Sequence, residues 1–262
     1  MKGNRLESFN ILKFGLGTPF VLITKENVSD FEAKKSPFHP AVKYTLKNNK
    51  GLSGVHLSDY FRVYLSYHFG GAYHDIKYRF PSKTISHCWK VFEDKNVWLV
   101  GMPNINGDAG DEDVKQYILE HDANGSDVVV SEEGKWNIKN SNDDNLISVG
   151  AWIARPKTEI FKKVINIAHK RLDGWFEDIK KYPVLDFKRC CQEGEVVGYP
   201  VAWQGLLGGI FHPYQAVYRS HIDRSMPWYN SLIWYGDDSE KVSPTNGKTA
   251  SVDIIKSNDD FR

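Results

Sequence analysis

Four charged residues lie close together in the stretch SDYFRVYLSYHFGGAYHDIKY, which spans residues 58–78. Asp59 and Arg62 are three positions apart, and Asp75 and Lys77 follow shortly after a double glycine. Carboxylates and a guanidinium can hold hydroxyl groups by charge-assisted hydrogen bonds, and a carboxylate can also bind a divalent cation. The competing interpretation is an ordinary surface ion pair followed by a charged strand end. Spacing alone does not decide between the two.

A helix must carry the first two of these charges. At 100° per residue, an apolar face gathers on one side, and Asp59, Arg62 and Ser66 fall on the other. The apolar face consists of Leu57, Phe61, Tyr64, Leu65 and His68. Ser58 is a suitable N-cap for this helix, and Gly70 suits the left-handed residue at its end.

A strand must carry the other two charges. Gly71 lets the chain turn directly from the helix into this strand. Tyr73, Asp75 and Lys77 then share one face, because side chains alternate along a strand. A carboxylate is thereby expected near the carboxyl end of a strand, where open α/β sheets bind ligands.

The rest of the chain predicts an α/β fold in one large domain. Apolar runs at 19–24, 96–103 and 146–156 indicate buried strands, and helical spacing at 4–14 and 159–182 indicates helices. Strands alternating with helices favour a sheet flanked by helices. Between the second and third strand, the polar stretch 104–144 is expected to be an acidic loop insertion. We expect the domain to cover residues 1–235 and a polar tail to cover 236–262.

Composition limits the partners and the compartment. The chain has 34 basic and 33 acidic residues, a net charge of +1, so no global field attracts nucleic acid. No apolar run approaches the roughly 20 residues of a membrane span. Three cysteines cannot make a disulfide framework, and the first ten residues lack the apolar centre of a secretory signal. We therefore expect a cytoplasmic protein without a transmembrane segment.

The segments SDYFR and GGAYHDIK resemble the donor-site signature of glycosyltransferases with the GT-A fold. The resemblance is to family 32 and to the capsular polysaccharide synthesis proteins, whose pattern is Ser-Asp, two residues, Arg, a helix, Gly-Gly, an aromatic residue and Asp-x-Asp. It implies a GT-A-like single domain with a mixed, mostly parallel sheet. It also implies transfer of a sugar, with retention of configuration, from a nucleotide sugar donor to a glycan or lipid-linked sugar acceptor.

The resemblance implies a role for each matching residue. Asp59 and Arg62 would hold the donor sugar, with Ser58 and Tyr73 as further substrate-binding residues of the same motif. Asp75 would be catalytic and face the metal, the diphosphate or the sugar. Such a site must hold the sugar rigidly and must provide a cation for the leaving diphosphate.

Lys77 departs from the family pattern, because it replaces the second acidic residue of the motif. An ammonium group cannot ligate Mn²⁺ or Mg²⁺, which prefer oxygen ligands. In one alternative, Asp75 still binds Mn²⁺ or Mg²⁺ together with diphosphate oxygens and a later ligand, His221 or its rival His212. In the other, Lys77 contacts the substrate and is itself the cation that neutralises the leaving diphosphate.

The segment GYPVAWQGLLGGIFHP, residues 198–213, resembles the part of the family that lines the acceptor side. Trp203 would stack on a sugar ring and Gln204, as a catalytic residue, would touch the reacting centre. A tryptophan in an apolar run is more often a core residue. The segment LISVGAWIARPKTEIFKKV resembles a second family landmark, a strand that ends in Ala-x-Pro before a long helix.

Two other functions stay open at this point. A catalytically silent GT-A relative could act as a sugar-binding or nucleotide-binding module. Two features favour this alternative. Lys77 replaces an acidic residue of the motif, and the sequence opens at the helix that would follow the usual first strand of the fold. A glycoside hydrolase could use a pair of carboxylates, but it does not explain the Asp59 and Arg62 helix face.

Overall fold

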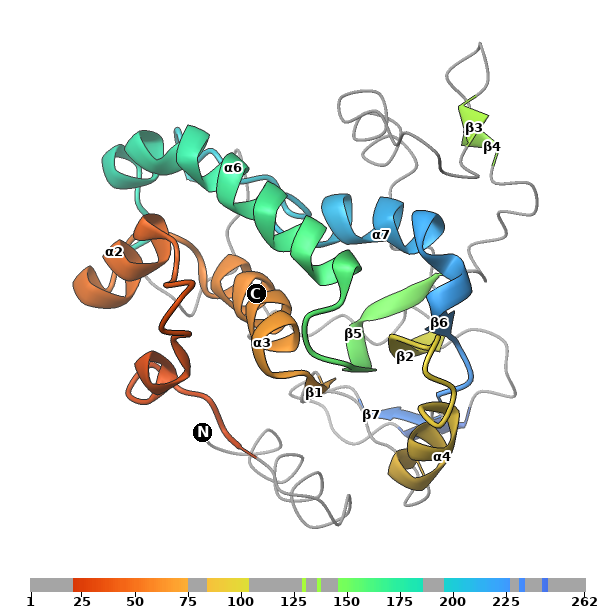
Figure 1. The fold of residues 1–262 in the computed structure, drawn as a ribbon. Helices are drawn as coiled ribbons and strands as arrows, with labels where there is room; N and C mark the ends of the chain where they lie inside the picture. The colour runs from red at the N-terminus through yellow and green to blue at the C-terminus, as the bar shows by residue number, and fades with distance from the viewer. Residues whose placement is uncertain are drawn as a thin grey trace.

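The computed structural model has a four-stranded mixed sheet flanked by helices (Figure 1). It describes residues 21–74, 84–103, 129–130, 136–137, 146–185, 196–226, 231–233 and 242–244. The expected helix at 4–14 lies outside these residues. Within them, no helix is long and apolar enough to cross a membrane.

The sheet has the strand order β1-β5-β2-β6, with β1 at Gly71–His74, β5 at Ile147–Ala154, β2 at Leu99–Pro103 and β6 at Ile222–Asp223. β5 runs antiparallel to both β1 and β2, and β6 runs parallel to β2. The sheet is thus mixed, as expected, but the expectation that it is mostly parallel is wrong for these strands. An apolar run shows that a strand is buried, but not which way its neighbours run.

Two further strand pairs lie outside this sheet. β3 (Val129–Val130) pairs with β4 (Trp136–Asn137), within the stretch expected to be a loop insertion. β7 (Ser231–Ile233) pairs with β8 (Val242–Pro244). Both pairs are antiparallel and short.

Helices cover both faces of the main sheet. The helices are α2 (Pro40–Asn48), α3 (Gly54–Phe69), α4 (Thr84–Val91), α6 (Glu159–Lys181) and α7 (Gly208–Val217), with short 3-10 turns η1 (Val28–Phe31) and η3 (Arg219–His221). Trp152 and Ala154 of β5 pack with α3, α6 and α7, whereas Ala151 and Ile153 pack with Cys88 of α4. Figure 1 shows α6 and α7 above the sheet and α4 below it.

An aromatic cluster fixes the larger core. The Trp152 ring lies 5.6 Å from that of Phe161 on α6 and 5.3 Å from that of Phe211 on α7. Its indole nitrogen donates a hydrogen bond of 2.9 Å to Oγ of Ser66 on α3. One side chain of β5 therefore fixes three helices to the sheet.

α3 begins earlier than the sequence predicts. Ser53, not Ser58, is the N-cap, since its Oγ accepts the amide hydrogen of His56 at 3.3 Å. Ser58 lies inside the helix. The end is as expected, because Gly70 has φ +68° and Gly71 has φ +88°, and β1 follows at once. The polar side of α3 is also buried: Asp59 is 7% exposed and Arg62 8%.

Of the other expected helices and strands, three are confirmed and one is wrong for its described residues. The strands expected at 96–103 and 146–156 are confirmed as β2 and β5, and the helix expected at 159–182 is confirmed as α6. The strand expected at 19–24 is wrong for residues 21–24, which have no regular structure. Val21 is 60% exposed and Leu22 41%, so this apolar run is not buried as a core strand would be.

Candidate functional site

Asp59 and Arg62 form a buried ion pair on α3. Nη2 of Arg62 lies 3.1 Å from Oδ1 of Asp59 and donates to Oγ of Ser58 at 3.3 Å. Both side chains are at most 10% exposed. The interpretation as an ordinary surface pair is therefore wrong, because this pair has lost most of its water.

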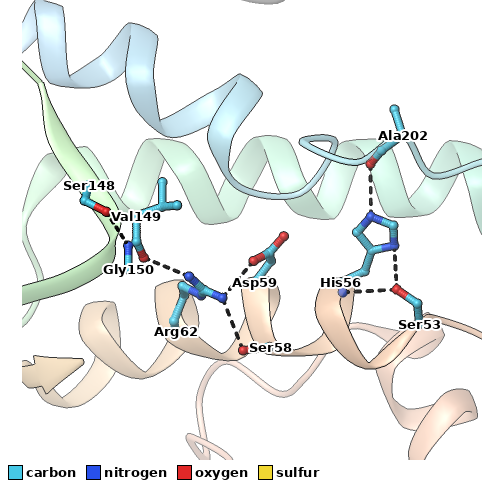
Figure 2. A network of polar contacts seen from close by, with 9 residues as sticks. All are labelled: Ser53, His56, Ser58, Asp59, Arg62, Ser148, Val149, Gly150 and Ala202. Atoms are coloured by element: carbon cyan, nitrogen blue, oxygen red, sulfur yellow. Dashed lines mark hydrogen bonds and ion pairs between the residues drawn. The ribbon is translucent and has the colours of Figure 1, made fainter. Parts of the chain in front are cut away.

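The Arg62 guanidinium also binds the sheet. Nη1 donates a hydrogen bond of 2.8 Å to the backbone carbonyl of Val149 on β5 (Figure 2). Its central carbon lies 4.5 Å from the centre of the Tyr73 ring on β1, which is a cation–π contact. The fold thus brings together Ser58, Asp59, Arg62 and Tyr73, four of the residues that the sequence singles out.

Asp75 and Lys77 lie outside the described residues. The described part of β1 ends at His74, which pairs with Ala151, two residues from Val149. The chain therefore leaves β1 at the end of the sheet where Arg62 is bound. The roles assigned to Asp75 and Lys77 stay predictions.

His56 connects α3 to the turn that carries Trp203 and Gln204. Its Nε2 donates to the carbonyl of Ala202 at 3.0 Å (Figure 2), and its Nδ1 lies 2.7 Å from the Tyr199 hydroxyl. The ring is fully buried, and this burial lowers its pKa to about 4. A neutral ring that donates through Nε2 accepts through Nδ1, so its tautomer is fixed.

A second hydrogen bond connects the same turn to α6. Nη1 of Arg171 donates to the carbonyl of Gly205 at 2.8 Å. Trp203 is 43% exposed on this turn, and Gln204 is half-buried. Sequence reasoning missed His56 and Arg171, because their acceptors are backbone carbonyls that leave no side-chain pattern.

His221 lies apart from the Asp59 and Arg62 pair. Its ring stacks on Trp98 with centres 3.8 Å apart, and its Nδ1 lies 2.8 Å from the carbonyl of Asn96. It directly precedes β6, three strand spacings from β1 and level with the start of β1. With strands about 4.8 Å apart and about 3.3 Å per residue, His221 is roughly 20 Å from the end of β1.

The described residues contain no group of three or more His, Cys, Asp or Glu side chains that could hold a metal ion. His212, the alternative ligand, is on α7 and is only 1% exposed. Neither of its ring nitrogens has a hydrogen-bond partner among the described residues. Burial lowers its pKa to about 4, so the ring is neutral at pH 7.

Comparisons of the chain with protein-family models, with curated proteins and with solved structures give no match. The functional conclusion therefore depends on the geometry of this site.

Proposed function

We propose that this protein transfers a sugar from a nucleoside-diphosphate sugar to a hydroxyl group of a glycan or lipid-linked acceptor. One observation carries the proposal. The buried Asp59 and Arg62 pair, with its 3.1 Å contact, lies against the Tyr73 ring of the strand that leads to Asp75. A carboxylate and a guanidinium held in this way suit the hydroxyl groups of a sugar.

For this reaction, holding the sugar nucleotide rigidly matters more than providing a strong general base. The acceptor oxygen forms a bond to the anomeric carbon, and the bond from that carbon to the diphosphate oxygen breaks. The electron pair leaves with the nucleoside diphosphate, and the acceptor's proton is released. Contacts to β5 and β1 fix Arg62 before the donor binds, which reduces the reorganisation needed for transfer.

The leaving diphosphate needs a positive charge, and two sources are compatible with the sequence. Asp75 could hold Mn²⁺ or Mg²⁺, or the Lys77 ammonium could neutralise the diphosphate directly. His221, the later ligand that the metal alternative assigned, stacks on Trp98 and lies 2.8 Å through Nδ1 from the Asn96 carbonyl. Both sources of positive charge stay open for the experiment to decide.

A panel of sugar nucleotides tests the proposal. The protein is incubated with UDP-glucose, UDP-galactose, UDP-N-acetylglucosamine and GDP-mannose, each with Mn²⁺ or with EDTA. We expect slow release of free nucleoside diphosphate from one donor. If that release continues in EDTA and Lys77→Ala abolishes it, lysine replaces the metal; if EDTA abolishes it, a metal is required.

Asp75→Asn serves as the control for the assigned site. We expect it to abolish turnover of the donor while the thermal unfolding midpoint stays that of the wild type. Full turnover in this variant would show that Asp75 has no part in the chemistry.

A catalytically silent binding module is the second candidate, and one observation favours it. The Arg62 guanidinium is already bound by Asp59, Ser58 and the Val149 carbonyl, so its contacts suffice for a structural role. Such a module would be stabilised thermally by a sugar nucleotide but would release no diphosphate.

A further inference from the structure

The turn at residues 202–205 carries the exposed indole of Trp203 and lies close to Asp59. His56 of α3 binds the carbonyl of Ala202 at 3.0 Å, and Asp59 is three residues further along the same helix. Residues three apart on a helix are neighbours, with Cβ atoms about 5 to 6 Å apart. One bound substrate pair can therefore reach both the turn and the Asp59 carboxylate.

The neighbours of Asp59 on α3 contact different parts of the fold. Arg62, three residues after it, binds the carbonyl of Val149 on β5 and the ring of Tyr73 on β1. His56, three residues before it, binds the turn. Figure 2 shows Asp59 between the two. The strand that leads to the proposed diphosphate site thus meets the ion pair on the Arg62 side, and the turn lies on the His56 side.

Arg171 of α6 fixes the end of this turn. Its Nη1 donates a hydrogen bond of 2.8 Å to the carbonyl of Gly205. Gly205 is closely packed, because a Cβ there would lie 3.2 Å from the Trp175 ring and 3.0 Å from the carbonyl oxygen of Ala202. The backbone that carries Trp203 therefore depends on where Arg171 holds Gly205.

We propose that Arg171 is a positioning residue for the acceptor, and that it acts through the Gly205 carbonyl on the Trp203 indole. The acceptor sugar stacks on this indole, which is 43% exposed, on the His56 side of the ion pair. In this role Arg171 touches neither substrate. The inference rests on the proposed function, in which a hydroxyl acceptor attacks the donor sugar.

The partition of the donor between transfer and hydrolysis tests this role. The protein is given the sugar nucleotide that it hydrolyses, together with the methyl glycoside of glucose, galactose, mannose or N-acetylglucosamine. We expect Arg171→Met to raise the KM for the methyl glycoside at least fivefold and to leave the kcat and KM of donor hydrolysis within twofold. A residue that only stabilises the fold would change both reactions together.

Two further variants test whether Arg171 acts through Trp203. We expect Trp203→Ala to raise the KM for the methyl glycoside, and the double variant with Arg171→Met to raise it no further, because the two changes remove one interaction. Arg171→Lys keeps a cationic donor that can supply the hydrogen bond to Gly205. We expect it to recover most of the loss.

Arg155 provides a matched control. It is half-buried like Arg171, and its Nε donates to a backbone carbonyl, that of Val97, at 2.8 Å. It directly follows β5, about 20 Å from Val149 at about 3.3 Å per residue. We expect Arg155→Met to lower the thermal unfolding midpoint and to leave the KM for the methyl glycoside within twofold of the wild type.

The outcomes separate this inference from the proposed function. Only the inference is overturned if the wild type hydrolyses a sugar nucleotide but transfers its sugar to none of the methyl glycosides. The same holds if Arg171→Met changes neither reaction or slows both equally, or if the double variant is worse than Trp203→Ala alone. If the wild type releases no nucleoside diphosphate from any donor of the panel, the proposed function fails and the role of Arg171 fails with it.

Discussion

The Arg62 guanidinium contacts three elements of the fold at once. It binds Asp59 and Ser58 on its own helix, the carbonyl of Val149 on β5 and the ring of Tyr73 on β1. Only a planar group with several donors can make these contacts together, so lysine would not replace it. At the residue scale, the same side chain is both a structural connection and the expected sugar contact.

The first prediction concerns the partner of this guanidinium. Asp59→Asn removes the negative charge and leaves the buried Arg62 without its carboxylate. We expect the free energy of unfolding in urea to fall by about 3 kcal/mol, as for other buried pairs that lose one member.

An exposed pair gives the matched comparison. Lys43 and Glu32 are 2.7 Å apart, with side chains 49% and 28% exposed. We expect Lys43→Met to change the free energy of unfolding by less than about 1 kcal/mol. An equally small loss for Asp59→Asn would mean that burial does not strengthen the pair.

The element that matters most to the site is the corner between α3 and β1. Gly70 has φ +68°, and a Cβ there would lie 2.8 Å from the backbone nitrogen of Pro156 and 2.9 Å from the carbonyl oxygen of Ala154. Gly71 has φ +88°, but a Cβ there would meet nothing within 4 Å. The two glycines share a backbone requirement and differ in the space around them.

This difference gives the second prediction. We expect Gly71→Ala to lower the free energy of unfolding by about 1 to 2 kcal/mol, from backbone strain alone. Gly70→Ala adds a collision with backbone atoms, and we expect it to cost at least about 1 kcal/mol more. Chemical denaturation of both variants measures this, and equal losses would show that the chain at Pro156 can move aside.

The sequence predicted this corner well, because helical apolar spacing and a glycine at a left-handed position are local signals. It failed to choose the right cap, since Ser53 and Ser58 both precede residues of the apolar face. It could not predict the direction of β5, because burial on both faces looks the same in either orientation. It also could not predict the contact of His56 with Ala202, which joins residues 146 positions apart.

At the scale of the whole molecule, neutral histidines that are buried or half-buried lie in separate parts of the fold. His56 is at the start of α3, His169 is on α6 and His212 is on α7. Burial lowers the pKa of each from 6.5 to about 4. The folded protein therefore resists protonation at three places where the unfolded chain accepts protons.

The third prediction is a loss of stability in mild acid. These histidines contribute their full stability above pH 6.5, and the contribution is lost as the pH falls towards 4. For the two fully buried rings, His56 and His212, this difference in pKa corresponds to roughly 3 kcal/mol each, and for the half-buried His169 to less, because water screens it. Urea unfolding at pH 7, 6 and 5 measures the effect. We expect the urea concentration at the unfolding midpoint to fall steadily with pH, and to fall less steeply for His169→Gln. A midpoint that does not change between pH 7 and pH 5 would contradict this prediction.

The turn at residues 202–205 is held at both ends by side chains of two different helices, His56 of α3 and Arg171 of α6. A backbone fastened in this way has little of the nanosecond-to-microsecond motion that is usual for loops. The exposed indole of Trp203 is left with rotation about its own bonds, which takes picoseconds to nanoseconds. A ligand that binds at this turn therefore requires only a rotation of the Trp203 ring. Little binding free energy is lost to ordering the backbone of the turn.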